Sequence, residues 1–244
     1  MILVGVAMSL VTACAPTSDK ADPWEKLNRV TYHFNDLLDR YALKPTADIY
    51  VKIIPSPIRD CIGNGFANLV YFNVILNDFL QAKWRQGFSD TGRFAMNSTI
   101  GIGGLFDMAS HFGMPAHDND MGVTLGKWGV PPGPYLVIPL LGPSDLRDTA
   151  RPIVIVLATP LTWMNLSWAI TVPLYVAYTI DTRSRYDFVV KFRNVAAVDP
   201  YIFTREAYLQ YRQGLIEETK PAVEQNIYDE DTDTEPATTQ PAAK

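Results

Sequence analysis

The 244-residue chain is predicted to fold as an all-α protein, and three observations support this class. Apolar residues recur every three or four positions in several long segments, which is the period of an amphipathic helix. Alternating patterns typical of strands are scarce. Charged residues make up only 19% of the chain, against about a quarter in soluble domains. The net charge of -5, with no basic cluster, predicts no nucleic-acid partner.

The N-terminus is typical of an exported lipoprotein. Residues 1–13 form an apolar run of signal-peptide length that is too short to cross a bilayer. It ends in Val11-Thr12-Ala13-Cys14, which resembles a bacterial lipobox. We therefore expect a signal peptide at 1–13, lipidation of Cys14 and a lipidated tether at 14–21. The first basic residue is Lys20, so we expect the true translation start to lie upstream.

Lipidation at Cys14 restricts where the rest of the chain can lie. Several acyl chains on one residue make anchoring effectively permanent. Ala15 follows the cysteine where aspartate would favour retention in the inner membrane, so an outer-membrane location on the periplasmic side is expected. The tether reaches at most ~30 Å when extended. The body must therefore lie on the membrane or embedded in it.

Residues 22–218 form the predicted helical domain. Asp22-Pro23-Trp24-Glu25 has the composition of a helix start, and we expect this helix to end before Pro45. Pro55 is expected to precede a second helix that reaches about Lys83, and a third begins at Phe88 or Ser89. Asp199-Pro200 predicts the start of the last helix. The acidic tail at 219–244 has few residues able to bury area and is expected to be disordered.

Two apolar segments break the simple helical pattern. Residues 119–143 are rich in glycine and proline, and predict an irregular loop too apolar to be solvated. Residues 153–180 contain no charge, but Pro160 and Pro173 should divide them into shorter membrane helices or a broken helix. Hydroxyl and amide groups in this stretch are candidates for the lining of a channel: Thr159, Thr162, Asn165, Ser167 and Thr171.

The residues give no sign of catalysis. No P-loop, HExxH, nucleophile elbow or CxxC is present, so we predict no enzyme activity, no catalytic residue and no cofactor. His111, His117, Asp118 and Asp120 match no standard metal spacing, so no metal is expected and a solvated loop is the simpler interpretation. Asp145 and Asp148, with Arg147 and Arg151, predict ion pairing at a helix start.

Several short blocks, in order, resemble the MlaA (VacJ) family of outer-membrane lipoproteins, and together they extend from about Asp22 to Arg212. Each block alone is weak, but their shared order behind a lipobox is specific. The blocks are DPWEKLNR at 22–29, Phe34-Asn35, RF at 93–94, NSTIGIGGLFD at 97–107, TLG at 124–126, WGV at 128–130, GPY at 133–135 with Pro139, LGP at 141–143 with Arg147-Asp148, DPY at 199–201 and REAY at 205–208.

The resemblance implies a ring-like bundle of helices embedded in the inner leaflet of the outer membrane. It implies an amphipathic channel that removes misplaced phospholipids from the outer leaflet, passes them to a periplasmic shuttle protein and so maintains lipid asymmetry. It also implies association with a trimeric porin. His33-Phe34-Asn35 stands where some members have Asn-Phe-Asn. Residues of the matching blocks are candidates for a gate or hairpin: Phe34, Asn35, Gly101, Gly103 and Gly104.

Two other functions are compatible with the same residues. A non-channel lipoprotein adaptor could scaffold a porin or envelope complex and use its apolar segments only for anchoring. A membrane-bound lipid hydrolase would need a nucleophile constellation, which the sequence lacks. Polar residues within apolar helices favour the channel, because a phospholipid path needs both characters.

Overall fold

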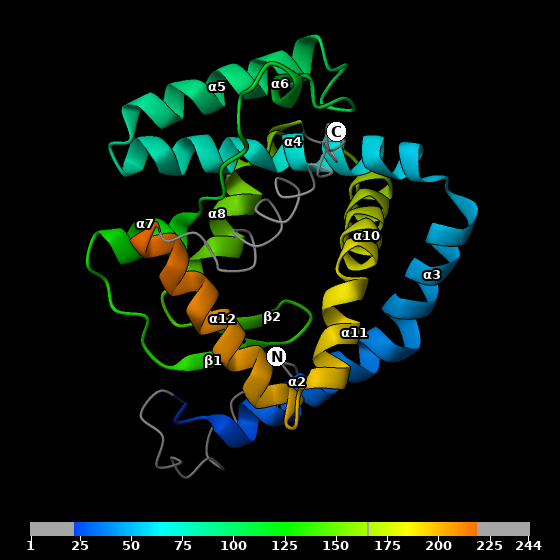
Figure 1. The fold of residues 1–244 in the computed structure, drawn as a ribbon, viewed down its shortest axis with the longest axis vertical. Helices are drawn as coiled ribbons and strands as arrows, with labels where there is room; N and C mark the ends of the chain where they lie inside the picture. Colours follow the sequence, from blue (N-terminus) through cyan, green and yellow to red (C-terminus); the bar gives the residue numbers. More distant parts are fainter. Residues whose placement is uncertain (1–21, 165, 219–244) are drawn as a thin grey trace, which may run out of the picture.

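The helices of this protein form a ring, which Figure 1 shows face-on. The computed structural model describes residues 22–164 and 166–218. The predictions for the signal peptide at 1–13, Cys14, the tether at 14–21, Asn165 and the tail at 219–244 therefore lie outside the described residues. Within the described ranges, no helix combines the length and the apolar character needed to cross a membrane.

The predicted all-α class is confirmed, since helices dominate the described chain and two short strands form its single small sheet. In chain order the elements are α2 (Glu25–Leu38), η2 (Asp39–Leu43), α3 (Lys44–Ile53), α4 (Ser56–Leu80), α5 (Trp84–Thr99), α6 (Met108–His111), α7 (Met121–Lys127), β1 (Tyr135–Ile138), β2 (Gly142–Asp145), α8 (Ala150–Ala158), α9 (Pro160–Trp163), α10 (Trp168–Arg185), α11 (Asp187–Ala196) and α12 (Pro200–Glu217).

The first side of the ring is one continuous helical rod, α2–η2–α3, so the prediction that this helix ends before Pro45 is wrong. In an α-helix Pro45 would lack one hydrogen bond and its ring would clash with the carbonyl of the preceding turn. The π-helical turn η2 widens the backbone just before Pro45, where the N–H of Lys44 bonds to the carbonyl of Asp39. The proline then stands in the first turn of α3, where its missing N–H has little cost.

The first helix also begins differently from the expectation. Asp22 was predicted to cap it, but α2 starts three residues later, at Glu25. The Asp22 side chain is fully buried and accepts hydrogen bonds from Asn28 (2.8 Å) and Arg205 (3.2 Å). It therefore joins the start of α2 to α12. Asp199, by contrast, caps α12 as predicted, through a 2.9 Å bond from the Tyr201 N–H.

Helices α4 and α5 pack side by side along another edge of the ring (Figure 1). α5 begins at Trp84, earlier than predicted, because a tight turn with Ala82 at positive φ joins the two helices. The asparagines of α4 turn inward: Asn73 donates to the carbonyl of Asn119 (3.2 Å), and Asn77 is fully buried. Several apolar side chains of the same helix, among them Phe72 (43% exposed), remain on the surface, whereas Val74 and Ile75 are buried.

The segment at 119–143 is more regular than predicted. It contains α7 and the strand β1, which pairs antiparallel with β2 in a hairpin. The glycines still mark the boundaries of these elements, since Gly129 follows the end of α7, Gly133 precedes the start of β1, and both have positive φ. The segment at 153–180 divides as predicted at Pro160, where α8 gives way to α9. Pro173, however, lies inside α10 and does not end it.

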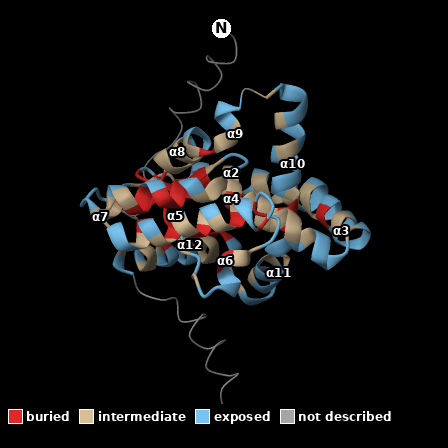
Figure 2. Ribbon diagram, turned by 90° about the horizontal axis from the view of Figure 1, so that it is seen from above, coloured by how far each residue is buried: buried red, intermediate tan, exposed pale blue. Residues whose placement is uncertain are grey.

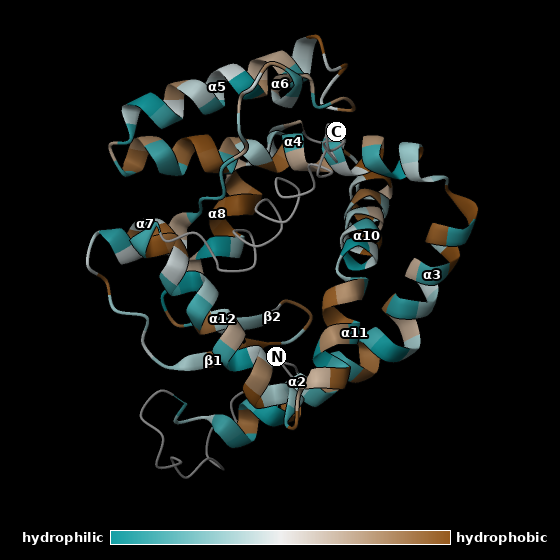
Figure 3. Ribbon diagram, viewed as in Figure 1, coloured by the Kyte–Doolittle hydropathy of each residue, from teal (hydrophilic) through white to brown (hydrophobic). Residues whose placement is uncertain are grey.

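The buried residues of this protein are mostly polar or charged, whereas those of a soluble domain are mostly hydrophobic. Among the described residues, twenty-one polar or charged side chains are buried, against eight hydrophobic ones. Many large apolar side chains are exposed instead. Figure 2 shows the buried positions as short stretches of helices that are otherwise intermediate or exposed, and Figure 3 shows hydrophobic residues spread over many of the same helices. Buried charges are tolerated only when paired and hydrogen-bonded. The interior must therefore be held together by ion pairs.

The central ion-pair cluster consists of Arg212, Asp120, Asp148, Arg147 and Asp145. Arg212 of α12 donates two bonds to Asp120 (2.6 and 2.8 Å) and lies 2.5 Å from an oxygen of Asp148. Arg147 contacts Asp148 (3.0 Å) and Asp145 (3.2 Å). The predicted ion pairing ahead of α8 is thus confirmed.

In the segment at 111–120, which we expected to be a solvated loop, Asp120 and His117 instead contact buried partners. Asp120 is buried in the ion-pair cluster and also caps α7, accepting from the Val123 N–H at 3.0 Å. His117 lies 2.9 Å from the fully buried Asp90 of α5. The loop is therefore held at both ends by partners distant in sequence, which its local composition did not indicate.

Replacing Arg212 with methionine should strongly destabilise the protein. The substitution keeps the volume of the stem but removes the close cation of buried Asp120 and one of the two cations of buried Asp148, a change that costs about 3–5 kcal/mol. Unfolding of the detergent-solubilised protein, followed by circular dichroism, would measure this. Arg151→Met is the matched control, because Arg151 is partly exposed and 4.0 Å from Asp120; its loss should cost under about 1 kcal/mol. Equal effects would contradict the central role of Arg212.

The stability of the fold should also depend on the protonation of Asp78. Burial first, and then the contact with neighbouring Asp90, raise the pKa of this carboxyl to about 7, against the lowering effect of the bond from Asn119. The native state then binds more protons than the unfolded chain between about pH 4 and 7, so the free energy of unfolding should fall as pH rises through this window.

The expected decrease is on the order of 1–3 kcal/mol, measured as unfolding free energy against pH in the same detergent. In Asp78→Asn the slope should flatten, because the amide cannot titrate and can donate as the protonated acid does. If Asp78→Asn retains the wild-type slope, the pH dependence belongs to another group.

Candidate functional site

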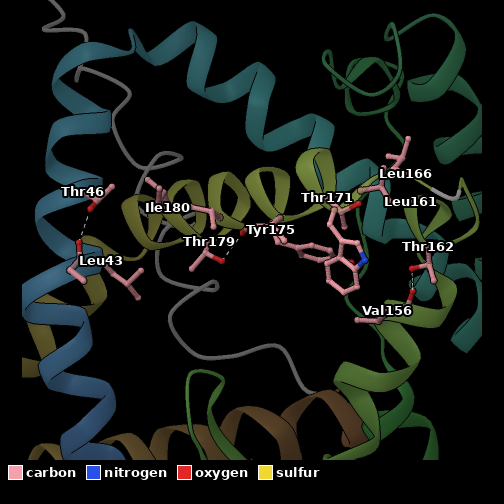
Figure 4. Close-up of a pocket in the computed structure, with 14 residues that line it drawn as sticks. Leu43, Thr46, Val156, Leu161, Thr162, Leu166, Thr171, Tyr175, Thr179 and Ile180 are labelled. Atoms are coloured by element: carbon pink, nitrogen blue, oxygen red, sulfur yellow. Dashed lines mark hydrogen bonds between the residues drawn. The ribbon is translucent and has the colours of Figure 1, made fainter.

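The main cavity of the described chain has a volume of about 710 Å³ and lies between the α2–η2–α3 rod and the helices α8 to α10 (Figure 4). Figure 4 shows Leu43 and Thr46 on one wall and Val156, Thr162 and Leu166 on the opposite one, with α10 between them. The volume is within the range of small-molecule sites. The lining residues are Ala42, Leu43, Thr46, Val156, Leu161, Thr162, Leu166, Trp168, Thr171, Val172, Tyr175, Val176, Thr179 and Ile180.

α10 supplies half of this lining because its cavity-facing residues are spaced three and four apart. Trp168, Thr171, Val172, Tyr175, Val176, Thr179 and Ile180 follow this period and therefore share one helical face. Ser167 begins the helix, and its hydroxyl accepts a bond from the Ala169 N–H at 3.3 Å. The helix is long enough to line the cavity from one end to the other.

The lining is uncharged, and its four threonine hydroxyl groups are already engaged. Thr46 donates to the carbonyl of Ala42 (2.7 Å), and Thr179 donates to that of Tyr175 (2.8 Å). Thr171 and Thr162 likewise donate to carbonyls of the backbone nearby. Such back-bonding leaves the threonines without a free donor proton. The cavity is thus suited to a hydrocarbon chain rather than to an ion or a sugar.

The predicted lining residues fall in three places. Thr162 and Thr171 lie on the cavity wall. Thr159 is buried behind it, beside a small apolar cavity, and donates to the Ile155 carbonyl (2.6 Å). Ser167 caps α10 and is not among the lining residues, while Asn165 lies outside the described residues. Thr46 and the η2 residues Ala42 and Leu43 were missed, because the candidates for the lining came only from the uncharged stretch at 153–180.

Two asparagines on α2 bind the hairpin. Asn35 donates to the Ile138 carbonyl (3.0 Å) and accepts from the Leu140 N–H (2.9 Å). Asn28 makes the same pair of bonds three residues earlier in the chain, with the Tyr135 carbonyl and the Val137 N–H (both 2.9 Å). Each amide thus satisfies a peptide group at the open edge of β1. Asn28 was missed, although its seven-residue spacing from Asn35 places both on one helical face.

The other candidates for a gate lie in a separate turn. Gly101, Gly103 and Gly104 follow α5, and the last two have positive φ. A Cβ atom at Gly104 would lie 2.3 Å from the Cβ of Asn68, so only glycine allows this turn to pack on α4. The half-exposed Phe34 lies next to Asn35 on α2. Asn35 therefore belongs, with Asn28, to the pair of asparagines that we call the hairpin clamp, Phe34 lies beside it, and the three glycines belong to the turn after α5.

An ion pair and a hydrogen bond join α10 to the α2–η2–α3 wall of the cavity. Arg183 of α10 binds Asp39 of η2 through two bonds, one of 3.0 Å. Tyr50 of α3 donates to Asp181 of α10 (2.9 Å); burial and this bond raise the pKa of Tyr50 to about 12, so the phenol stays protonated. These contacts lie at the C-terminal end of α10 and fix it against the α2–η2–α3 rod.

A family model for the MlaA lipoproteins matches residues 20–215. The chain belongs to the MlaA lipoprotein family. It is 32% identical over 218 residues to the intermembrane phospholipid transport system lipoprotein MlaA of Shigella flexneri, covering 85% of this chain and 84% of that protein. The protein of the same name from Escherichia coli (strain K12) gives the same values. That of Haemophilus influenzae is 29% identical over 236 residues, with 90% and 93% coverage.

The MlaA fold is also recognised in three dimensions. A solved structure from work on the "structural basis for maintenance of bacterial outer membrane lipid asymmetry" matches with a TM-score of 0.70 and 32% identity. The match covers 80% of this chain and 98% of the other. The range matched by the MlaA family model contains both walls of the cavity and the hairpin clamp. The similarity to the MlaA family therefore extends over most of the ring.

Proposed function

We propose that this MlaA-family protein acts in intermembrane phospholipid transport at the outer membrane, where its cavity takes up the acyl portion of a lipid. The observation that carries the proposal is the uncharged, hydrocarbon-lined cavity within a ring of helices. Relatives 32% identical over most of their length bear names that state intermembrane phospholipid transport. The proposed result is removal of misplaced outer-leaflet phospholipids, which maintains lipid asymmetry.

The apolar outer surface supports embedding in the inner leaflet, reached from the periplasmic side. Figure 2 shows α9 and the adjoining end of α10 standing out from the plane of the other helices. Trp163 (75% exposed) and Trp168 (83% exposed) are at this end, with Met164 between them. Exposed aromatic groups of this kind are favoured where protein meets the membrane interface. We propose that this projecting end, the α9–α10 tip, inserts into the bilayer.

The transport step that we propose needs no covalent chemistry. A phospholipid in the wrong leaflet can leave through the ring if its chains contact apolar side chains and its headgroup stays near polar ones. Because the protein carries no energy source of its own in this scheme, a downstream acceptor must supply the free energy. We propose a periplasmic shuttle protein as that acceptor and a trimeric porin as the companion in the membrane.

A single charge in the cavity should separate transport from anchoring. Val176→Asp places a carboxylate on the apolar wall, which should block passage of acyl chains because burying an unpaired charge is costly. Val176→Thr is the matched control, since it keeps the shape of the side chain without the charge. We expect the aspartate variant to leave phospholipid on the cell surface and the threonine variant to remove it as wild type does.

The measurement is outer-leaflet phospholipid in cells that carry each variant at equal outer-membrane abundance. If Val176→Asp at normal abundance removes surface phospholipid as well as Val176→Thr, the cavity is not the path. The protein would then be an adaptor that scaffolds a porin or envelope complex, with its apolar surfaces serving only to anchor it.

Deletion of the gene tests the transport role as a whole. Surface phospholipid should rise in the deletion strain and return to normal with the wild-type chain. Cys14→Ala should fail to restore it, because the lipidated thiol is the proposed anchor. Unchanged surface phospholipid on deletion would overturn the transport role, and full rescue by Cys14→Ala would overturn the requirement for the anchor.

A further inference from the structure

A second recess, of about 660 Å³, lies outside the cavity just described, at the turn between α4 and α5. Figure 1 shows this corner of the ring beside α7 and the final turns of α12. Cationic and polar side chains predominate in it, unlike the uncharged lining of the main cavity. The recess is lined by Ala82, Lys83, Trp84, Arg85, Gln86, Ser89, His117 and Glu218.

Two lysines share one carboxylate here. Lys83 lies 2.8 Å from an oxygen of Glu218, and Lys127 contacts the same oxygen. The two lysines hold the pKa of Glu218 down to about 2. The pKa of Lys127 is nonetheless lowered, by burial first and then by Lys83 against the pull of Glu218. One carboxylate therefore does not neutralise the pair, and a surplus positive charge remains.

Further donors border the same recess. Arg85 is exposed and makes no ion pair with any described residue between 22 and 218. Trp84 to Gln86 form the first turn of α5, whose N-cap residue, Lys83, provides no side-chain cap bond. The backbone N–H groups of such a turn favour an anion. The carboxylate of Glu218 thus occupies one part of a site whose cations and donors exceed what it can satisfy.

We propose that this recess binds the phosphate of an anionic phospholipid headgroup, which displaces Glu218 from Lys83 and Lys127. A phosphate diester has the charge and the acceptor oxygens that two ammonium groups and a guanidinium bind. Trp84 (60% exposed) and Phe88 (67% exposed) adjoin these cations, and this combination of aromatic and basic residues is typical of a membrane interface. The choice of a lipid over free phosphate rests on the proposed function.

Substitution of the cations and substitution of Glu218 should have opposite effects on the affinity for the ligand. Lys83→Gln/Arg85→Gln removes two cations and should weaken binding about 10-fold or more. Glu218→Gln removes the internal competitor and should tighten binding about 5-fold, since the lysines no longer need to be released. A carboxylate with only a structural role would give no gain in affinity on substitution. The matched control is Arg40→Gln/Lys44→Gln, which removes two cations on η2 and α3 whose carboxylate partners lie one helical turn away.

The experiment is calorimetric titration of the full-length detergent-solubilised protein with dihexanoyl phosphatidylglycerol, with inorganic phosphate and dihexanoyl phosphatidylcholine as parallel ligands. Phosphatidylglycerol should bind at least about 5-fold more tightly than either alternative. Each titration is repeated in the Val176→Asp background, where the main cavity is blocked, so that binding at the recess is measured separately. Melting temperatures confirm that every variant is folded.

Several results would overturn the proposal. Equal affinity for inorganic phosphate would make the recess a general anion site, and equal affinity for phosphatidylcholine would remove the selectivity for anionic headgroups. Unchanged or weaker binding by Glu218→Gln would show that this residue does not compete. A loss in the Arg40/Lys44 control as large as that in the Lys83/Arg85 variant would reduce the effect to net charge. These outcomes are independent of surface phospholipid levels, so failure here leaves the transport proposal standing.

Discussion

The buried contact of Arg212 with Asp120 and Asp148 is the interaction on which the rest of this ring depends. One guanidinium joins α12 to the start of α7 and to the turn before α8, three elements that are far apart in the sequence. Glycine at position 122 is part of the same arrangement, because a Cβ there would lie 2.1 Å from an oxygen of Asp148. Low-dielectric surroundings strengthen such contacts and make a missing partner costly. At this point the ring is therefore closed by charge pairing, while a small apolar cluster of Tyr135, Val137 and Tyr201 packs the hairpin against α12.

This way of closing the ring leaves the apolar side chains free for other contacts. Because asparagine, aspartate and arginine fill the interior, leucine, phenylalanine and tryptophan can face a bilayer on the outside and an acyl chain in the cavity. The same chain then presents apolar side chains in two places, at its outer surface and in the cavity, which are the two places where we propose contact with lipid. In a soluble domain those side chains would be consumed by the core.

The sequence predicts the local features of this fold and misses those that depend on distant contacts. The α12 start at Asp199 and the break at Pro160 follow from capping and from proline chemistry, which act within one turn. The hairpin clamp joins residues more than 100 positions apart, so no local pattern contains it. The sequence around Asp22 is typical of a helix cap, but its buried carboxylate instead accepts a hydrogen bond from the Asn28 side chain. Thr46 entered the cavity wall only because η2 carries the helix past Pro45.

The π-helical turn η2 indicates how the α2–η2–α3 wall of the cavity can differ in length by one residue. A π-turn is an α-helix that has accommodated one additional residue as a local bulge. The bulge absorbs the rotation of about 100° that an extra residue would otherwise impose on everything beyond it. Asn35 before η2 and Thr46 after it consequently keep their separate facings, toward the hairpin and toward the cavity. The rod at η2 thus accommodates an additional residue without a change in which side chains face the hairpin and the cavity.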